Sequence, residues 1–220
     1  VRAGVTTEAL DQAAAALLAA ERARSAPALE YGFPRTVLIS VNDEIVHGVP
    51  GPRVLADGDL VKLDVTVEKD GYVADAARTV VVGAASLTAS RLKACVQAAF
   101  EAGLAQVRVG QRVSAIGRAV DAEVKRHGFK GVQGLSGHGV GRKIHEEPSV
   151  PNYYDPWQAD VLTEGLVLTI EPMVSAGSPR AIQEQNGWTI RTADRSLAAH
   201  YEHTIVVTAG APVLLTAAAS

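Results

Sequence analysis

The chain has 220 residues, of which 47% are hydrophobic, and this excludes disorder as its main state. Lys and Arg number 21 against 24 Asp and Glu, a formal net charge of −3, and no basic run indicates a nucleic-acid substrate or an anionic membrane surface. The single cysteine, Cys95, excludes an intrachain disulfide and a zinc site built from cysteines, which fits a reducing compartment such as the cytoplasm.

The first half of the chain is predicted to form one helix and three strands. Residues 6–24 have the spacing of an amphipathic helix, and the apolar run inside it is far too short to cross a membrane. Runs of β-branched residues bounded by turn residues predict strands at 35–41, 59–68 and 72–83, the last two joined in a hairpin by a turn at residues 68–71.

The second half is predicted to mix helices and strands in a similar way. Helical spacing marks residues 87–105 and 113–127, and strand patterns follow at 165–174, 188–192 and 202–208. Strands and helices do not alternate strictly, which favours an α+β fold with antiparallel sheets over a doubly wound parallel sheet.

A weak internal repeat relates the two halves. Residues 1–16 resemble residues 107–122, and residues 58–64 resemble residues 165–171 at almost the same offset. We therefore expect a single domain over residues 1–220, made of pseudo-repeat halves at about 1–106 and 107–220 that are related by a pseudo-twofold axis. The helix predicted before the second copy has no counterpart ahead of Val1, so an upstream helix is expected to be absent from this chain.

Acidic residues inside the predicted strands point to a metal. Asp64 and Asp75 are equidistant from the centre of the hairpin turn and are expected to face each other directly, where like charges destabilise a sheet unless a cation lies between them. A solvated hairpin face is the alternative. Glu171 matches Asp64 in the repeat and Glu202 opens the last long strand, so four acids converge on one place, as in a dinuclear site.

The histidines divide into candidates and structural residues. His138 lies in a glycine-rich segment that frees its imidazole to serve as a metal ligand, and His47 and His145 are candidates for the surroundings of the site or for substrate contact. The other histidines have no pattern around them and are expected to be structural: His127, His200 and His203.

With these residues in place, the chain resembles the type I methionine aminopeptidases, which have the pita-bread metallopeptidase fold. The motifs are SVNDEIVHGVP, DVTVEKDGYVADAARTVVVG, GHGVGRKIHEEPSVPNY, EGLVLTIEPMV and DRSLAAHYEHTIVV. The resemblance implies a pseudo-twofold pair of helix-plus-antiparallel-sheet halves around a central dinuclear metal site. It also implies five ligands to two divalent ions (Fe, Mn, Co or Zn), with Asp75 and Glu202 bridging the ions: Asp64, Asp75, His138, Glu171 and Glu202.

The implied activity is removal of the N-terminal methionine from peptides and nascent proteins, preferably when the second residue is small. A bridging water activated by the metals attacks the scissile carbonyl, Glu171 carries the proton to the leaving amine, His145 stabilises the oxyanion and His47 contacts the substrate. The resemblance assigns substrate binding to six residues: His47, His145, Phe33, Leu38, Ile144 and Trp188.

The chain departs from the family in the pocket for the first side chain. Glu30 stands where an aromatic residue is usual, Leu38 where many relatives have cysteine, and Ile144 where Phe is common. These changes leave open a specialised or inhibitor-resistant paralogue with altered specificity for the first residue. A proline-specific peptidase of the same fold and a non-catalytic N-terminus-binding protein are further alternatives, although the former usually carries an added domain and the latter usually loses metal ligands.

The expected partners follow from the implied activity. They are the N-termini of peptides and nascent chains, with the ribosome as a further candidate, and neither nucleic acid nor a membrane is expected as a partner. We expect a monomer in the cytoplasm.

Overall fold

A computed structural model describes residues 1–217. The helices in this part are α1 (Thr7–Ala20), α2 (Ala26–Tyr31), α3 (Leu87–Leu104) and α4 (Ser114–Arg126). The strands of the first half are β1 (Arg24–Ser25), β2 (Leu38–Val41), β3 (Glu44–Val46), β4 (Leu60–Lys69) and β5 (Tyr72–Val81). Those of the second half are β6 (Lys130–Gly131), β7 (Ser136–Gly139), β8 (Glu146–Pro151), β9 (Val167–Ile170), β10 (Met173–Ser175), β11 (Ala181–Gln183), β12 (Ile190–Thr192), β13 (Ala198–His200), β14 (Glu202–Val206) and β15 (Val213–Leu214).

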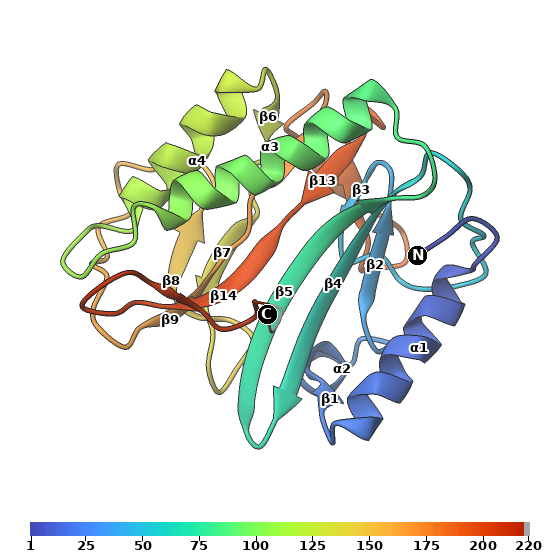
Figure 1. Cartoon of the computed structure of the whole chain (residues 1–220), viewed down its shortest axis with the longest axis horizontal. Helices are drawn as coiled ribbons and strands as arrows, with labels where there is room; N and C mark the ends of the chain where they lie inside the picture. The colour runs from blue at the N-terminus through green and yellow to red at the C-terminus, as the bar shows by residue number, and fades with distance from the viewer. Residues whose placement is uncertain (218–220) are drawn as a thin grey trace.

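A nine-stranded antiparallel sheet forms the body of the molecule, and its long β4–β5 hairpin runs through the middle of Figure 1. Its order is β1-β4-β5-β14-β9-β7-β8, with β2 also paired to β4 and β15 to β14. Two three-stranded sheets, β13-β10-β6 and β11-β12-β3, flank it. The mixture of helices with antiparallel sheets agrees with the predicted α+β class.

Helices cover the sheet from outside. α3 and α4 lie against each other over one face of the sheet, and α1 lies beside β2 at the other end (Figure 1). Leu92 and Phe100 of α3 and Ile116 of α4 are at most 3% exposed, and they share a core with Leu168 and Ile205 of the sheet. Burying such side chains stabilises the fold by about 1.5–3 kcal/mol each, which fixes the strands that carry the polar inner face.

Two pairs of positions in the structure keep the offset of the sequence repeat. α1 spans residues 7–20 and α4 spans residues 114–126, an offset of 107 at their first residues. The same offset relates Asp64 in β4 to Glu171, which directly follows β9.

The β4–β5 hairpin corrects one prediction. The loop is the two-residue turn Asp70–Gly71, both at positive φ (54° and 82°), rather than a turn over residues 68–71. An Asp-Gly pair favours this turn because its backbone twist matches that of the strands. The register therefore pairs Asp64 with Ala77 and Thr66 with Asp75. The expectation that Asp64 and Asp75 face each other directly is wrong, and they are diagonal neighbours on one face.

Some strand boundaries also differ from the prediction. The strand expected at 165–174 is divided into β9 and β10 at Glu171 and Pro172, since proline cannot donate a ladder hydrogen bond. The strand expected at 35–41 begins only at Leu38. His138, expected in a glycine-rich loop, lies in strand β7. Among residues 1–217, no helix has both the length and the hydropathy needed to span a membrane.

Candidate metal centre

Three neighbouring strands present carboxylates on the inner face of the sheet. Asp64 of β4 and Glu202 of β14 both pair with Ala77 of the intervening strand β5. Direct partners in a sheet point to the same side, and residues two apart on a strand share a face, so Asp75 joins them. The small side chain of Ala77 leaves open the space between the three acids.

Glu171 and His138 complete the cluster from the other half. Continuing the β14–β9 register, in which His203 pairs with Ile170, places Glu171 beside Glu202. The backbone N–H of His138 donates to Thr169 Oγ1 (3.0 Å), and this hydroxyl donates to Glu171 Oε2 (2.7 Å). One buried threonine therefore fixes both side chains relative to each other.

Close backbone packing explains the glycine before His138. A Cβ on Gly137 would lie 2.6 Å from the carbonyl oxygen of Thr169, closer than any side chain tolerates. The His138 ring is also oriented, because its Nδ1–H donates to the carbonyl oxygen of Gly139 (2.9 Å). Nε2 then keeps a free lone pair, which is the arrangement that metal-binding histidines adopt.

The five predicted ligands are buried together, each at most 9% exposed. Burial raises the pKa of Asp64 well above its usual value, and repulsion from Asp75 and Glu171 raises it further. Burial likewise raises the pKa of Glu202 and of Asp75, and raises that of Glu171 to about 8. The pKa of His138 is lowered, mainly by burial. The cluster disfavours charge on every member unless a cation is bound among them.

The donor atoms fit divalent ions. Among residues 1–217, no Lys or Arg forms an ion pair with these acids, and Asp64 Oδ1 and Glu202 Oε1 are buried with no hydrogen-bond partner. Two sets of candidate ligand atoms, each within 4.8 Å of one another, share Glu202: one is Asp64, His200 and Glu202, and the other is Asp75, His138 and Glu202. Buried oxygen and imidazole donors without counter-ions suit a dinuclear centre of borderline divalent metals, and they do not single out one metal.

An apolar pocket opens beside this centre. The six residues assigned to substrate binding all line it: Phe33, Leu38, His47, Ile144, His145 and Trp188. The rings of Phe33 and Trp188 meet edge to face with centroids 5.2 Å apart, although the residues are far apart in the sequence. Met173 also lines the pocket and was not predicted.

α2 holds the loop that carries His145. The hydroxyl of Tyr31 forms a hydrogen bond with His145 Nδ1 (2.7 Å), and the pKa of Tyr31 is raised by partial burial and by Glu30, so the hydroxyl keeps its proton. With the hydroxyl as the donor, Nε2 of His145 carries the ring proton. Glu30 Oε2 accepts the backbone N–H of Ile144 (2.9 Å). Glu30, where the family usually has an aromatic residue, therefore fastens α2 to this loop.

His47 also lines the pocket. It follows β3 and has a positive φ of 58°. Its carbonyl oxygen accepts a hydrogen bond from Thr189 Oγ1 (3.4 Å). Burial, and to a lesser degree His145, lowers its pKa to about 4, so the imidazole is neutral near pH 7.

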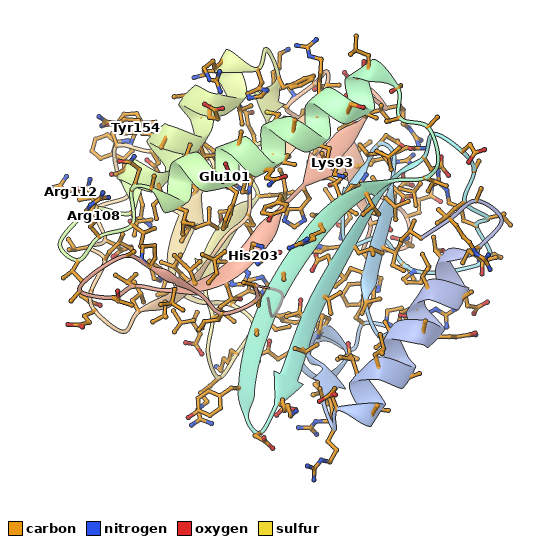
Figure 2. The ribbon with its side chains drawn as sticks, in the orientation of Figure 1. Lys93, Glu101, Arg108, Arg112, Tyr154 and His203 are labelled. Carbon is orange, nitrogen blue, oxygen red and sulfur yellow. The ribbon has the colours of Figure 1, made fainter. Side chains whose placement is uncertain are left out.

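Two of the remaining histidines have structural roles, and the third, His200, differs from the prediction. His127 pairs with Glu123 (3.1 Å), and His203, labelled beneath α3 in Figure 2, bonds Thr216 (2.8 Å). Both are structural, as expected. His200 is different, because it lines the pocket and belongs to one of the two sets of candidate ligand atoms. Its three-residue strand, β13, carries no amphipathic pattern from which the sequence could have predicted this position.

The site combines buried acids and an imidazole on an antiparallel sheet with an apolar pocket beside them. These are the features of a metal-dependent hydrolase. The chain belongs to metallopeptidase family M24, whose model matches residues 1–209.

Relatives support this assignment over nearly the whole chain. Methionine aminopeptidase 2 of Bacillus subtilis is 40% identical over 215 residues, covering 97% of this chain and 86% of the relative. The crystal structure of methionine aminopeptidase from Thermotoga maritima superposes with a TM-score of 0.96 at 33% identity, covering 99% of this chain and 88% of that one. A prolidase from Pyrococcus furiosus shares the fold alone, at 22% identity and a TM-score of 0.78, and this chain spans 58% of its length.

Proposed function

We propose that the protein is a methionine aminopeptidase that removes the first residue from peptides beginning with methionine. The observation that carries the proposal is the buried cluster of four acids and His138 on the floor of a pocket walled by Phe33 and Trp188. The identity to methionine aminopeptidases over most of both chains supports the same activity. We infer that residues 1–220 act as one domain, since the central sheet contains strands from β1 to β15.

Asp64, Asp75, His138, Glu171 and Glu202 would hold two divalent ions, with Asp75 and Glu202 between them. When bound, such ions polarise a carbonyl as Lewis acids and lower the pKa of water. The chain's own residues supply positioning and proton transfer. Glu171, hydrogen-bonded to the Thr169 hydroxyl, is placed to carry a proton to the leaving amine.

The neutral imidazoles at the pocket have separate tasks. When the Tyr31 hydroxyl donates to Nδ1 of His145, the Nε2–H of His145 is the donor available to a developing oxyanion. His47, neutral near pH 7 and partly buried, is placed to hydrogen-bond the substrate near the scissile nitrogen. A preorganised donor costs no reorganisation during the reaction, which makes it more effective than a mobile one.

The pocket accounts for a preference for methionine. Its walls combine aromatic rings with the aliphatic Leu38 and Ile144, which are 6% and 3% exposed. A flexible, unbranched thioether packs well against such mixed surfaces. We expect the aliphatic walls to keep methionine as the first residue, and we expect small second residues to be preferred.

The test is release of free methionine by metal-depleted protein resupplied with Mn(II), Co(II) or Fe(II). Peptides beginning Met-Ala should be cleaved only with metal, whereas peptides beginning Leu-Ala and Xaa-Pro dipeptides should not. Glu202→Gln should lower kcat/KM at least about 100-fold, while the matched control Glu101→Gln, on the exposed face of α3 (Figure 2), should not change it. Cleavage of Xaa-Pro substrates, or binding of Met-initiated peptides without cleavage by the metal-loaded protein, would contradict the proposal.

We also propose a setting for the activity. N-termini of nascent chains are the natural substrates of such an enzyme, and a single buried cysteine suits the cytoplasm. The ribosome contact and the monomeric state stay predictions.

A further inference from the structure

His200 is a buried imidazole to which the five-ligand centre assigns no role. It ends strand β13 and is 2% exposed. Neither ring nitrogen has a hydrogen-bond partner within residues 1–217. A buried polar ring normally has such partners, so its nitrogens are expected to serve another purpose.

Two acids near His200 also have buried atoms without hydrogen-bond partners within residues 1–217. Asp64 Oδ1 and Glu202 Oε1 are also buried and unpaired within that range, and ligand atoms of Asp64, His200 and Glu202 lie within 4.8 Å of one another. Three unpaired donor groups therefore converge on one point. Lys62, which lies opposite Thr79 in the hairpin, does not relieve them, because its Nζ donates to the carbonyl oxygen of Asn42 (2.7 Å).

The spacing of the atoms suits coordination better than hydrogen bonding. His200 Nε2 lies 3.6 Å from Glu202 Oε2, too far for a hydrogen bond. Two ligands of one ion, each bonded at about 2.0–2.2 Å, are roughly 3.0–3.5 Å apart. The corresponding pair in the other half of the centre, His138 Nε2 and Glu171 Oε2, is 3.5 Å apart. The two histidine–glutamate pairs therefore have nearly the same geometry.

The backbone of His200 is held firmly in this position. Thr79 Oγ1 donates to the His200 carbonyl oxygen (2.7 Å) and accepts the His200 N–H (2.9 Å). On its other side His200 pairs with Met173 of β10. A side chain on so constrained a backbone is preorganised, as a ligand position requires.

The geometry points to His200 as a sixth ligand, which gives the ion on the Asp64 side an imidazole nitrogen. Each of the two ions then has one histidine, His138 on one side and His200 on the other, instead of a single histidine for the pair. This inference rests on the dinuclear centre of the proposed function. It implies tighter retention of the ion beside Asp64 than three carboxylates alone provide.

X-ray absorption fine structure of protein loaded with two equivalents of Co(II) counts the imidazoles directly. The expected result is an average of one imidazole per cobalt in the wild type and about half that number in His200→Gln. Calorimetric titration should show that His200→Gln weakens one of the two binding steps at least about tenfold. His200→Leu is a second variant, used because the glutamine side chain of His200→Gln could itself bind the metal. His127→Gln is the matched control and should titrate like the wild type.

The outcomes separate this inference from the proposed function. A wild-type average of half an imidazole per cobalt, or unchanged binding of both ions by His200→Gln and His200→Leu, would overturn the assignment of His200. Metal-dependent release of methionine by that same protein would leave the proposed function standing. Failure of the wild type to bind two ions would instead contradict the proposed function itself.

Discussion

Thr169 links two predicted ligands, so its replacement tests how the centre is positioned. Its hydroxyl accepts the His138 N–H at 3.0 Å and donates to Glu171 Oε2 at 2.7 Å, and the residue is fully buried. Thr169→Val keeps the shape of the side chain but removes both hydrogen bonds. The variant therefore leaves a buried N–H unpaired and a carboxylate without its donor.

Loss of the hydrogen bond from His138 should affect stability, and loss of the hydrogen bond to Glu171 should affect metal affinity. The unpaired His138 N–H should lower the free energy of unfolding of the metal-free protein by about 1–3 kcal/mol. The bond to Glu171 counts most when the carboxylate is ionised, as it is when it binds a metal, and hydrogen bonds to charged groups contribute about 1.5–3 kcal/mol. Metal affinity should therefore fall by about 10–100-fold, the range found when residues that orient ligands are replaced.

Urea unfolding of the metal-free protein and calorimetric titration with Mn(II) would measure the two effects separately. Thr169→Ser keeps the hydroxyl and should retain most of the metal affinity. Thr208→Val removes an exposed threonine hydroxyl that donates to Ala211 (2.8 Å) and should change neither quantity by more than about 0.5 kcal/mol. Wild-type unfolding and wild-type metal affinity in Thr169→Val would refute the reasoning.

Three further predictions concern other parts of the molecule. Tyr31→Phe removes the hydroxyl that is hydrogen-bonded to His145 and should lower kcat about tenfold with little change in Tm, since Tyr31 is 49% exposed. Gly137→Ala places a Cβ 2.6 Å from the Thr169 carbonyl oxygen and should cost about 3 kcal/mol or more in urea unfolding. Burial raises the pKa of the Cys95 thiol from 9.0 to about 12. The folded state therefore favours the neutral thiol, so the stability linked to Cys95 should be fully present below pH 9 and should be lost as the pH rises towards 12.

Each of these predictions has a result that would contradict it. Unchanged kcat in Tyr31→Phe would mean that the hydroxyl does not orient His145. A Gly137→Ala variant as stable as the wild type would show that the strand can move away from β9. For Cys95, the decline in stability above pH 9 should be absent in Cys95→Ala, and an equal decline in both proteins would assign it to other groups.

The predicted strands and the internal repeat were enough to predict the acidic inner face. Asp64 and Asp75 both fall on the buried polar side of their strands, and the repeat led from Asp64 to Glu171 without a structure. Their register could not be predicted from the midpoint of the turn alone. It depends on which residues adopt positive φ, and the Asp70–Gly71 pair shifts the partner of Asp64 by two residues, to Ala77.

Other features of the site depend on contacts between distant segments. His200 lies on a strand of three residues, too short for periodicity to be informative, and reaches the centre because β13 pairs with β10. The contact between Phe33 and Trp188 joins the two halves of the chain, and no local pattern predicts it. The role of Glu30 was likewise hidden, because its partner, the N–H of Ile144, is 114 residues away.

Crystals soaked in Mn(II) and measured at the manganese absorption edge would locate the metal ions directly. Two anomalous peaks are predicted within the buried cluster, one beside Asp64 and the other beside His138 and Glu171, with Asp75 and Glu202 between them. No peak in the cluster, or a single peak bound outside these five side chains, would contradict the dinuclear centre on which the proposed activity depends.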